Sequence, residues 1–143
     1  MSLYDLIQDP DKRRAVVDDS NVVLEAEVKE KGFMVKTAFK VVKGIRPGFI
    51  PMAIDNLLDD FSQKLDPHFS AWNDAGRNGS LSQHFSQNAG TIANDLLSVT
   101  DHRAATAKSG TVKKAYNKLR PTATKHISAA MPRIADLVNK HIG

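Results

Sequence analysis

The chain contains no cysteine, and this absence excludes disulfides, thiolate metal sites and cysteine nucleophiles. It is poor in aromatic residues, which make up 6% of the sequence and include a single tryptophan. No uninterrupted apolar run approaches the roughly 20 residues that span a bilayer, and acids stand at the N-terminus where a signal peptide needs bases. These absences predict a soluble, cytoplasmic protein.

What is present is the composition of an ordinary globular protein. The 143 residues are 41% hydrophobic and 25% charged, unlike the composition of a disordered chain. A chain of this length buries about two-thirds of its unfolded surface when it folds. We therefore expect one domain that spans residues 1–143.

Helix signals occur along nearly the whole chain. Asp9 and Asp66 each precede a proline, as residues at the start of a helix do, and apolar residues recur at helical spacing, as in Val35, Ala38 and Val42. No segment alternates as a strand does. The pattern predicts an all-α, compact bundle of six to eight helices, some of them short and started by proline. A short N-terminal turn should precede helices near residues 10–18, 20–31, 33–44, 49–64, 67–75, 81–107, 111–120 and 121–142.

Patterns typical of catalysis and of cofactor binding are missing. The histidines lack metal-ligand spacing, no nucleophile elbow is present, and the glycine pair at Gly76 and Gly79 lacks the spacing of a phosphate-binding loop. The nearest pairing of a histidine with a carboxylate is His68 with Asp66, and capping already explains Asp66. We expect no catalytic residue, metal or cofactor, and we interpret the five histidines as surface or structural residues: His68, His84, His102, His126 and His141.

Charge is distributed in four alternating blocks. Residues 1–30 hold four bases and eight acids, whereas residues 31–50 hold five bases and no acid. Residues 51–100 hold two bases and six acids, and residues 101–143 hold nine bases and two acids. Such asymmetry indicates an acidic partner, an acidic ligand, or pairing of complementary surfaces within the fold.

The segment 33–44 is expected to be a helix with two distinct faces. Lys36, Lys40 and Lys43 fall within an arc of roughly 60° on a helical projection, opposite the apolar stripe. A helix of this kind is able to lie on an anionic membrane or to accept an acidic partner. Because it has three lysines and no tryptophan on its apolar side, we favour the simpler interpretation that these lysines point to water.

The segment 103–125 contains seven bases and no acid, and it is the strongest candidate for a binding surface. Lys114 and Lys118 share one helical face, where their charges repel each other. The candidate residues are Arg103, Lys108, Lys113, Lys114, Lys118, Arg120 and Lys125. His102 and His126 flank the segment and are able to tune its charge near neutral pH.

Three hypotheses of function follow. The first is a non-catalytic module that binds an acidic protein or another acidic macromolecule through the segment 103–125. The second is sequence-independent nucleic-acid binding by the same face, although no known nucleic-acid-binding motif is present. The third is a small-molecule-binding protein or enzyme with a site between helices, which requires a deep pocket with converging polar side chains. The alternative to any binding at the basic face is that the acidic and basic blocks pair with each other within the fold.

Three stretches carry a resemblance to known sequences. They are Val41-Val-Lys-Gly-Ile-Arg-Pro-Gly-Phe-Ile-Pro51, Thr100-Asp-His-Arg103 and Tyr116-Asn-Lys-Leu-Arg120. With them, nearly the whole chain resembles a small family of uncharacterised bacterial proteins of about this length. The resemblance implies a free-standing domain and transfers no functional residue.

Overall fold

Side chains cap the helix starts, as the sequence predicts. In the computed structural model, which describes residues 2–142, the Asp9 carboxylate accepts the N–H of Lys12, and Pro10 opens α2 (Pro10–Lys29). Ser80 caps α5 (Leu81–Gln87) in the same way. α7 (Gly110–Ala129) begins after Ser109, whose hydroxyl accepts a backbone N–H.

Eight α-helices and no strand are present within residues 2–142, which confirms the all-α bundle of six to eight helices. The five helices not yet named are α1 (Leu3–Leu6), α3 (Phe33–Lys43), α4 (Phe49–Asp74), α6 (Ala89–Thr106) and α8 (Met131–Ile142).

Several predicted boundaries are wrong. One helix, α2, covers the two that we predicted at 10–18 and 20–31 and ends at Lys29, and α4 continues through Pro67, where we predicted a new start. α7 likewise continues through Pro121. Both prolines lie on exposed positions, as do Gln63 and Asn117, whose carbonyls lose their helical donors and are left to bond water.

The predicted helix 81–107 is divided at Asn88. The Asn88 side-chain amide donates to the carbonyl of His84 at 2.8 Å, and this local bond competes with the continuing helix. α5 ends there, and α6 starts in a new direction.

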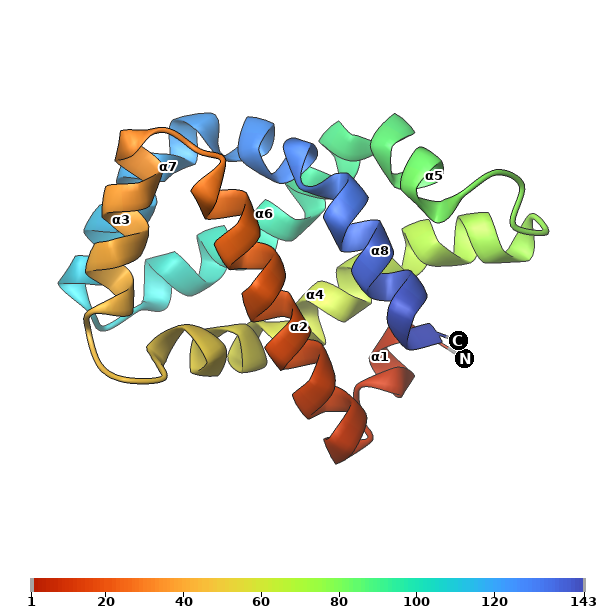
Figure 1. Cartoon of the computed structure of the whole chain (residues 1–143), viewed down its shortest axis with the longest axis horizontal. Coiled ribbons are helices and arrows are strands. Elements are labelled where there is room, and N and C mark those ends of the chain that lie inside the picture. The colour runs from red at the N-terminus through yellow and green to blue at the C-terminus, as the bar shows by residue number, and fades with distance from the viewer. Residues whose placement is uncertain (1, 143) are drawn as a thin grey trace.

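The eight helices form a bundle in which distant segments lie side by side (Figure 1). α2 crosses α4, α3 lies beside α7, and α5 packs against α8. α1 lies close to the C-terminal end of α8 (Figure 1), and Leu3 and Val138 belong to one buried cluster. The two basic segments of the sequence, on α3 and α7, are therefore neighbours in space.

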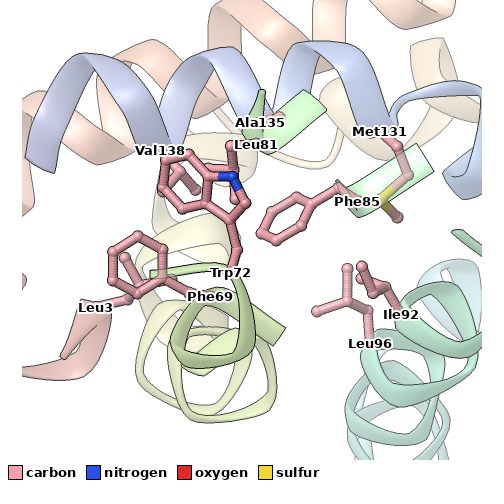
Figure 2. Packing of buried hydrophobic residues seen from close by; sticks show 10 residues of the cluster. All are labelled: Leu3, Phe69, Trp72, Leu81, Phe85, Ile92, Leu96, Met131, Ala135 and Val138. Carbon is pink, nitrogen blue, oxygen red and sulfur yellow. The ribbon is translucent and has the colours of Figure 1, made fainter. Parts of the chain in front are cut away.

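The tightest packing joins α5, α6 and α8 to the C-terminal half of α4. Figure 2 shows the Phe85 ring between Trp72 and Met131, and Phe85, Leu81 and Met131 are each fully buried. The Trp72 ring borders this cluster and donates its N–H to the carbonyl of Gly79. A second, smaller buried cluster joins α2 to the middle of α4, around Val16 and Leu58.

Candidate ligand cavity between the helices

A cavity of about 550 Å³ separates the helices between these packed regions. Side chains from seven of the eight helices line it, and α5 is the helix that does not. Protein interiors contain few voids larger than a water molecule, and small-molecule sites typically measure roughly 300–1,000 Å³. The volume is that of a ligand site and far exceeds a packing defect.

The wall of the cavity is almost entirely apolar. Leucine, isoleucine and valine side chains supply most of it, among them Leu24, Leu57, Leu119 and Leu137. These four residues are only half-buried, although they face the interior, because the space they line is partly open to solvent. An apolar wall of this kind favours apolar ligands, because covering it removes apolar surface from water.

A small polar group lies in the wall where α2 ends. Glu27 is buried, and its Oε2 accepts a hydrogen bond from Arg133 of α8. Its Oε1 has no hydrogen-bond donor within residues 2–142, and Lys31 Nζ lies 3.4 Å from it. Both Glu27 and Lys31 line the cavity. A buried acceptor with spare capacity is costly unless a further donor reaches it.

His126 of α7 belongs to the same part of the wall. Burial lowers the pKa of its imidazole, and the positive charges of Lys31 and Lys125 lower this pKa further. Thr122 Oγ1 lies 3.1 Å from its Nε2. The lowered pKa favours the neutral ring, which presents both a donor and an acceptor.

A hydrogen-bonded cluster closes the wall between α6 and α7. The Tyr116 hydroxyl lies 2.8 Å from Thr100 Oγ1 and donates to Asp101. The Arg120 guanidinium donates to both oxygens of Asp101, at 2.8 and 3.1 Å. Hydrogen bonds from Arg120 and then from Tyr116 lower the pKa of Asp101, and burial raises the pKa of Tyr116. This cluster fixes α6 against α7 beside the cavity.

The structure divides the predicted basic surface into two kinds of residue. Arg103 pairs with Asp60 at 3.0 Å and Arg120 pairs with Asp101, so internal carboxylates occupy both arginines. The other five candidates are exposed, and no carboxylate of residues 2–142 forms an ion pair with them: Lys108, Lys113, Lys114, Lys118 and Lys125. Ion pairs within the fold therefore explain the two arginines of the basic segment but not its five lysines.

The histidines are held apart. His68 pairs with Asp95 at 2.7 Å, and His141 pairs with Asp19 at 2.7 Å. Asp66 does not face His68, because it accepts backbone hydrogen bonds from α1. In the described part of the chain no three potential metal ligands converge. Nor does any helix of residues 2–142 combine the length and apolar character that a membrane-spanning segment needs.

Sequence reasoning missed most of the cavity. Of its candidate residues only Arg120 lines the space, together with His126 from the flank of the basic segment. Val35 of the predicted apolar stripe also lines it, although such a stripe is the usual pattern of a packed core. No sequence signal distinguishes a stripe that meets another helix from one that faces a void.

Together these features define an all-helical protein built around a largely apolar cavity with a few polar groups in its wall. The chain belongs to a family of unknown function, DUF6918, whose model matches residues 3–142. The match confirms the resemblance to an uncharacterised domain of this length. No curated protein and no solved structure matches the chain.

Proposed function

We propose that the protein binds one lipid-like amphiphile, such as a long-chain fatty acid, in the cavity between its helices. The observation that supports this function is a cavity of about 550 Å³ with an almost wholly apolar wall. Pockets that bury most of a small ligand combine such a wall with a few convergent polar groups. The proposal develops the third hypothesis from the sequence, a site between helices.

Burial of the apolar wall favours a bound apolar chain. The wall is almost wholly apolar and the cavity is partly open, so a ligand that enters it covers apolar side chains that otherwise contact solvent. Each Å² of apolar surface removed from water contributes roughly 25 cal/mol.

The polar group at the end of α2 is suited to the head of such a ligand. Lys31 supplies a positive charge to a carboxylate, and His126 supplies a hydrogen bond. Glu27 Oε1, which pairs with Lys31 but accepts no hydrogen bond within residues 2–142, is able to accept one from a hydroxyl or a protonated acid. The rest of the ligand lies against leucine, isoleucine and valine.

A dansyl-labelled fatty acid and its displacement by palmitate test the function. In Ala123→Phe a ring enters the cavity from α7, whereas Ala129→Phe places the same ring on an exposed position of the same helix. We expect Ala123→Phe to weaken probe binding about tenfold or more, because the ring takes the volume of the chain. Ala129→Phe should bind as the wild type does. Equal affinities of the two variants, or no binding by the wild type, would contradict the proposal.

A second candidate is binding of an acidic macromolecule through the exposed lysines of the segment 103–125. The observation that favours it is the absence of carboxylate partners for these lysines within residues 2–142. Duplex DNA and polyglutamate at low salt are suitable probes, and binding to either should weaken steeply with salt. Lys114→Glu with Lys118→Glu should abolish it. Failure of both probes to bind the wild type excludes this candidate.

A further inference from the structure

The outward face of α3 carries large apolar side chains in contact with solvent. Phe33 is 85% exposed, Met34 51% and Val41 50%. On a helical projection, residues 33, 34, 37 and 41 fall within an arc of roughly 100°. This arc lies between the lysines and the stripe of Val35, Ala38 and Val42, which turn toward the protein. The face that we interpreted from the sequence as an ordinary polar surface is therefore partly apolar.

Exposed apolar residues also follow the end of α3. Ile45 and Met52 are both exposed. The Arg46 guanidinium lies over the Phe49 ring, 5.7 Å from its centroid, and donates to the Met52 sulfur at 2.8 Å. A cation and apolar side chains thus lie together at the start of α4 as well.

The segment that contains α3 is basic. Residues 31–50 contain five bases and no acid. Lys43 pairs with Glu25 at 3.2 Å, with both side chains largely exposed, whereas Lys36 and Lys40 are exposed and form no ion pair within residues 2–142. α7, with its own exposed lysines, lies directly beside α3 (Figure 1).

We infer that α3 docks the protein on an anionic phospholipid membrane, with Phe33, Met34 and Val41 entering the interface and Lys36 and Lys40 contacting the headgroups. We assign a membrane as the partner from the positive charge of α3 and from the shape of its exposed side chains. Apolar tips among lysines on one helix face suit a soft, negatively charged interface, in which each long lysine side chain reaches the phosphates. The anionic surface of a membrane attracts clustered basic residues over about one Debye length.

The docking surface adjoins the proposed ligand site. Lys31 lines the cavity and stands two residues before α3 begins, and Val35 of α3 lines the same cavity. Docking through α3 therefore holds the polar part of the cavity wall close to lipid. This inference goes beyond ligand binding, and docking itself does not require a ligand in the cavity.

Sedimentation with vesicles tests the docking. Vesicles of phosphatidylcholine mixed with phosphatidylserine are compared with vesicles of phosphatidylcholine alone. We expect the wild type to sediment with the mixed vesicles and not with the neutral ones. Lys36→Glu with Lys40→Glu should lower the affinity for mixed vesicles about tenfold or more, as should Phe33→Ser with Val41→Ser. Added salt should release the wild type.

The matched control is Arg14→Glu with Lys64→Glu, which makes the same change of net charge on exposed positions of α2 and α4. It should keep at least half of the wild-type affinity. Phe33→Trp gives an optical readout, because its emission should shift to shorter wavelength on the mixed vesicles, while buried Trp72 of the wild type should not respond.

Three results would overturn the inference. The first is that the wild type does not bind mixed vesicles. The second is that the control variant loses as much affinity as the α3 variants. The third is that the wild type forms a dimer instead of binding vesicles, and that Phe33→Ser disrupts this dimer. None of these results depends on the dansyl-labelled fatty acid, so a failure of docking is distinguishable from a failure of cavity binding.

Discussion

Asp66 shows how a single side chain acts far from its place in the sequence. Its carboxylate accepts the N–H of Leu3 at 2.6 Å and the N–H of Tyr4 at 3.3 Å, and so caps the first turn of α1. The sequence placed Asp66 at the start of a helix at Pro67, and this prediction is wrong. Asp66 is a capping residue, as predicted, but the helix that it caps is α1, which lies 63 residues away in the chain.

The first prediction concerns this cap. Asp66→Ala leaves two N–H groups of α1 without their acceptor, and we expect the free energy of unfolding to fall by about 1–3 kcal/mol. Urea unfolding measures the loss, and hydrogen exchange should show that the amides of Leu3 and Tyr4 lose protection. Asp66→Asn keeps one oxygen acceptor and should lose less. Unchanged exchange at α1 in Asp66→Ala would show that the cap contributes nothing.

Glu27 shows what residue chemistry alone leaves undetermined. In the sequence it is one of eight acids in the first 30 residues, with nothing to distinguish it. In the structure it is buried, it is bound to Arg133 of α8, and it lines the cavity. Its role depends on a partner 106 residues away, and no local pattern indicates such a partner.

At the scale of elements, the sequence predicts the presence of a helix more accurately than it predicts the residues at which the helix begins and ends. The cap at Asp9 and the apolar stripe of α3 are predicted correctly, because each depends on residues within one or two turns. Pro67 and Pro121 were misread as helix starts. A proline in mid-helix is tolerated when the carbonyl it frees faces water, and exposure is a property of the folded protein.

α3 shows the same limit on one helix. The lysine arc and the inward stripe were both predicted correctly from periodicity. Phe33, Met34 and Val41 were not recognised as exposed, because a helix that packs against α2, α4 and α7 could bury apolar groups on more than one side. How far each neighbour covers α3 depends on crossing geometry, which the sequence does not encode locally.

At the scale of the whole molecule, periodicity shows which residues face inward but not whether the inward faces meet. Leu24, Leu57 and Leu119 satisfy the pattern of a packed core, yet a void separates them. The lengths and crossings of α2, α4 and α7 set the distance between these helices. The cavity is therefore a property of the assembly of helices, and it changed our preferred function from the basic surface to the interior.

The last prediction belongs to this scale, because a ligand that binds only the folded state stabilises the whole protein. Palmitate at about 100 times its Kd should raise the free energy of unfolding of the wild type by about 2.7 kcal/mol and raise the Tm by several degrees.

Ala123→Phe should unfold at a higher temperature than the wild type when no ligand is present, because its ring fills part of the cavity. The same variant should show little further rise with palmitate. Thermal unfolding followed by circular dichroism over a palmitate series measures both effects. A wild-type Tm independent of palmitate, or an equal rise in Ala123→Phe, would mean that the ligand does not occupy the space between the helices.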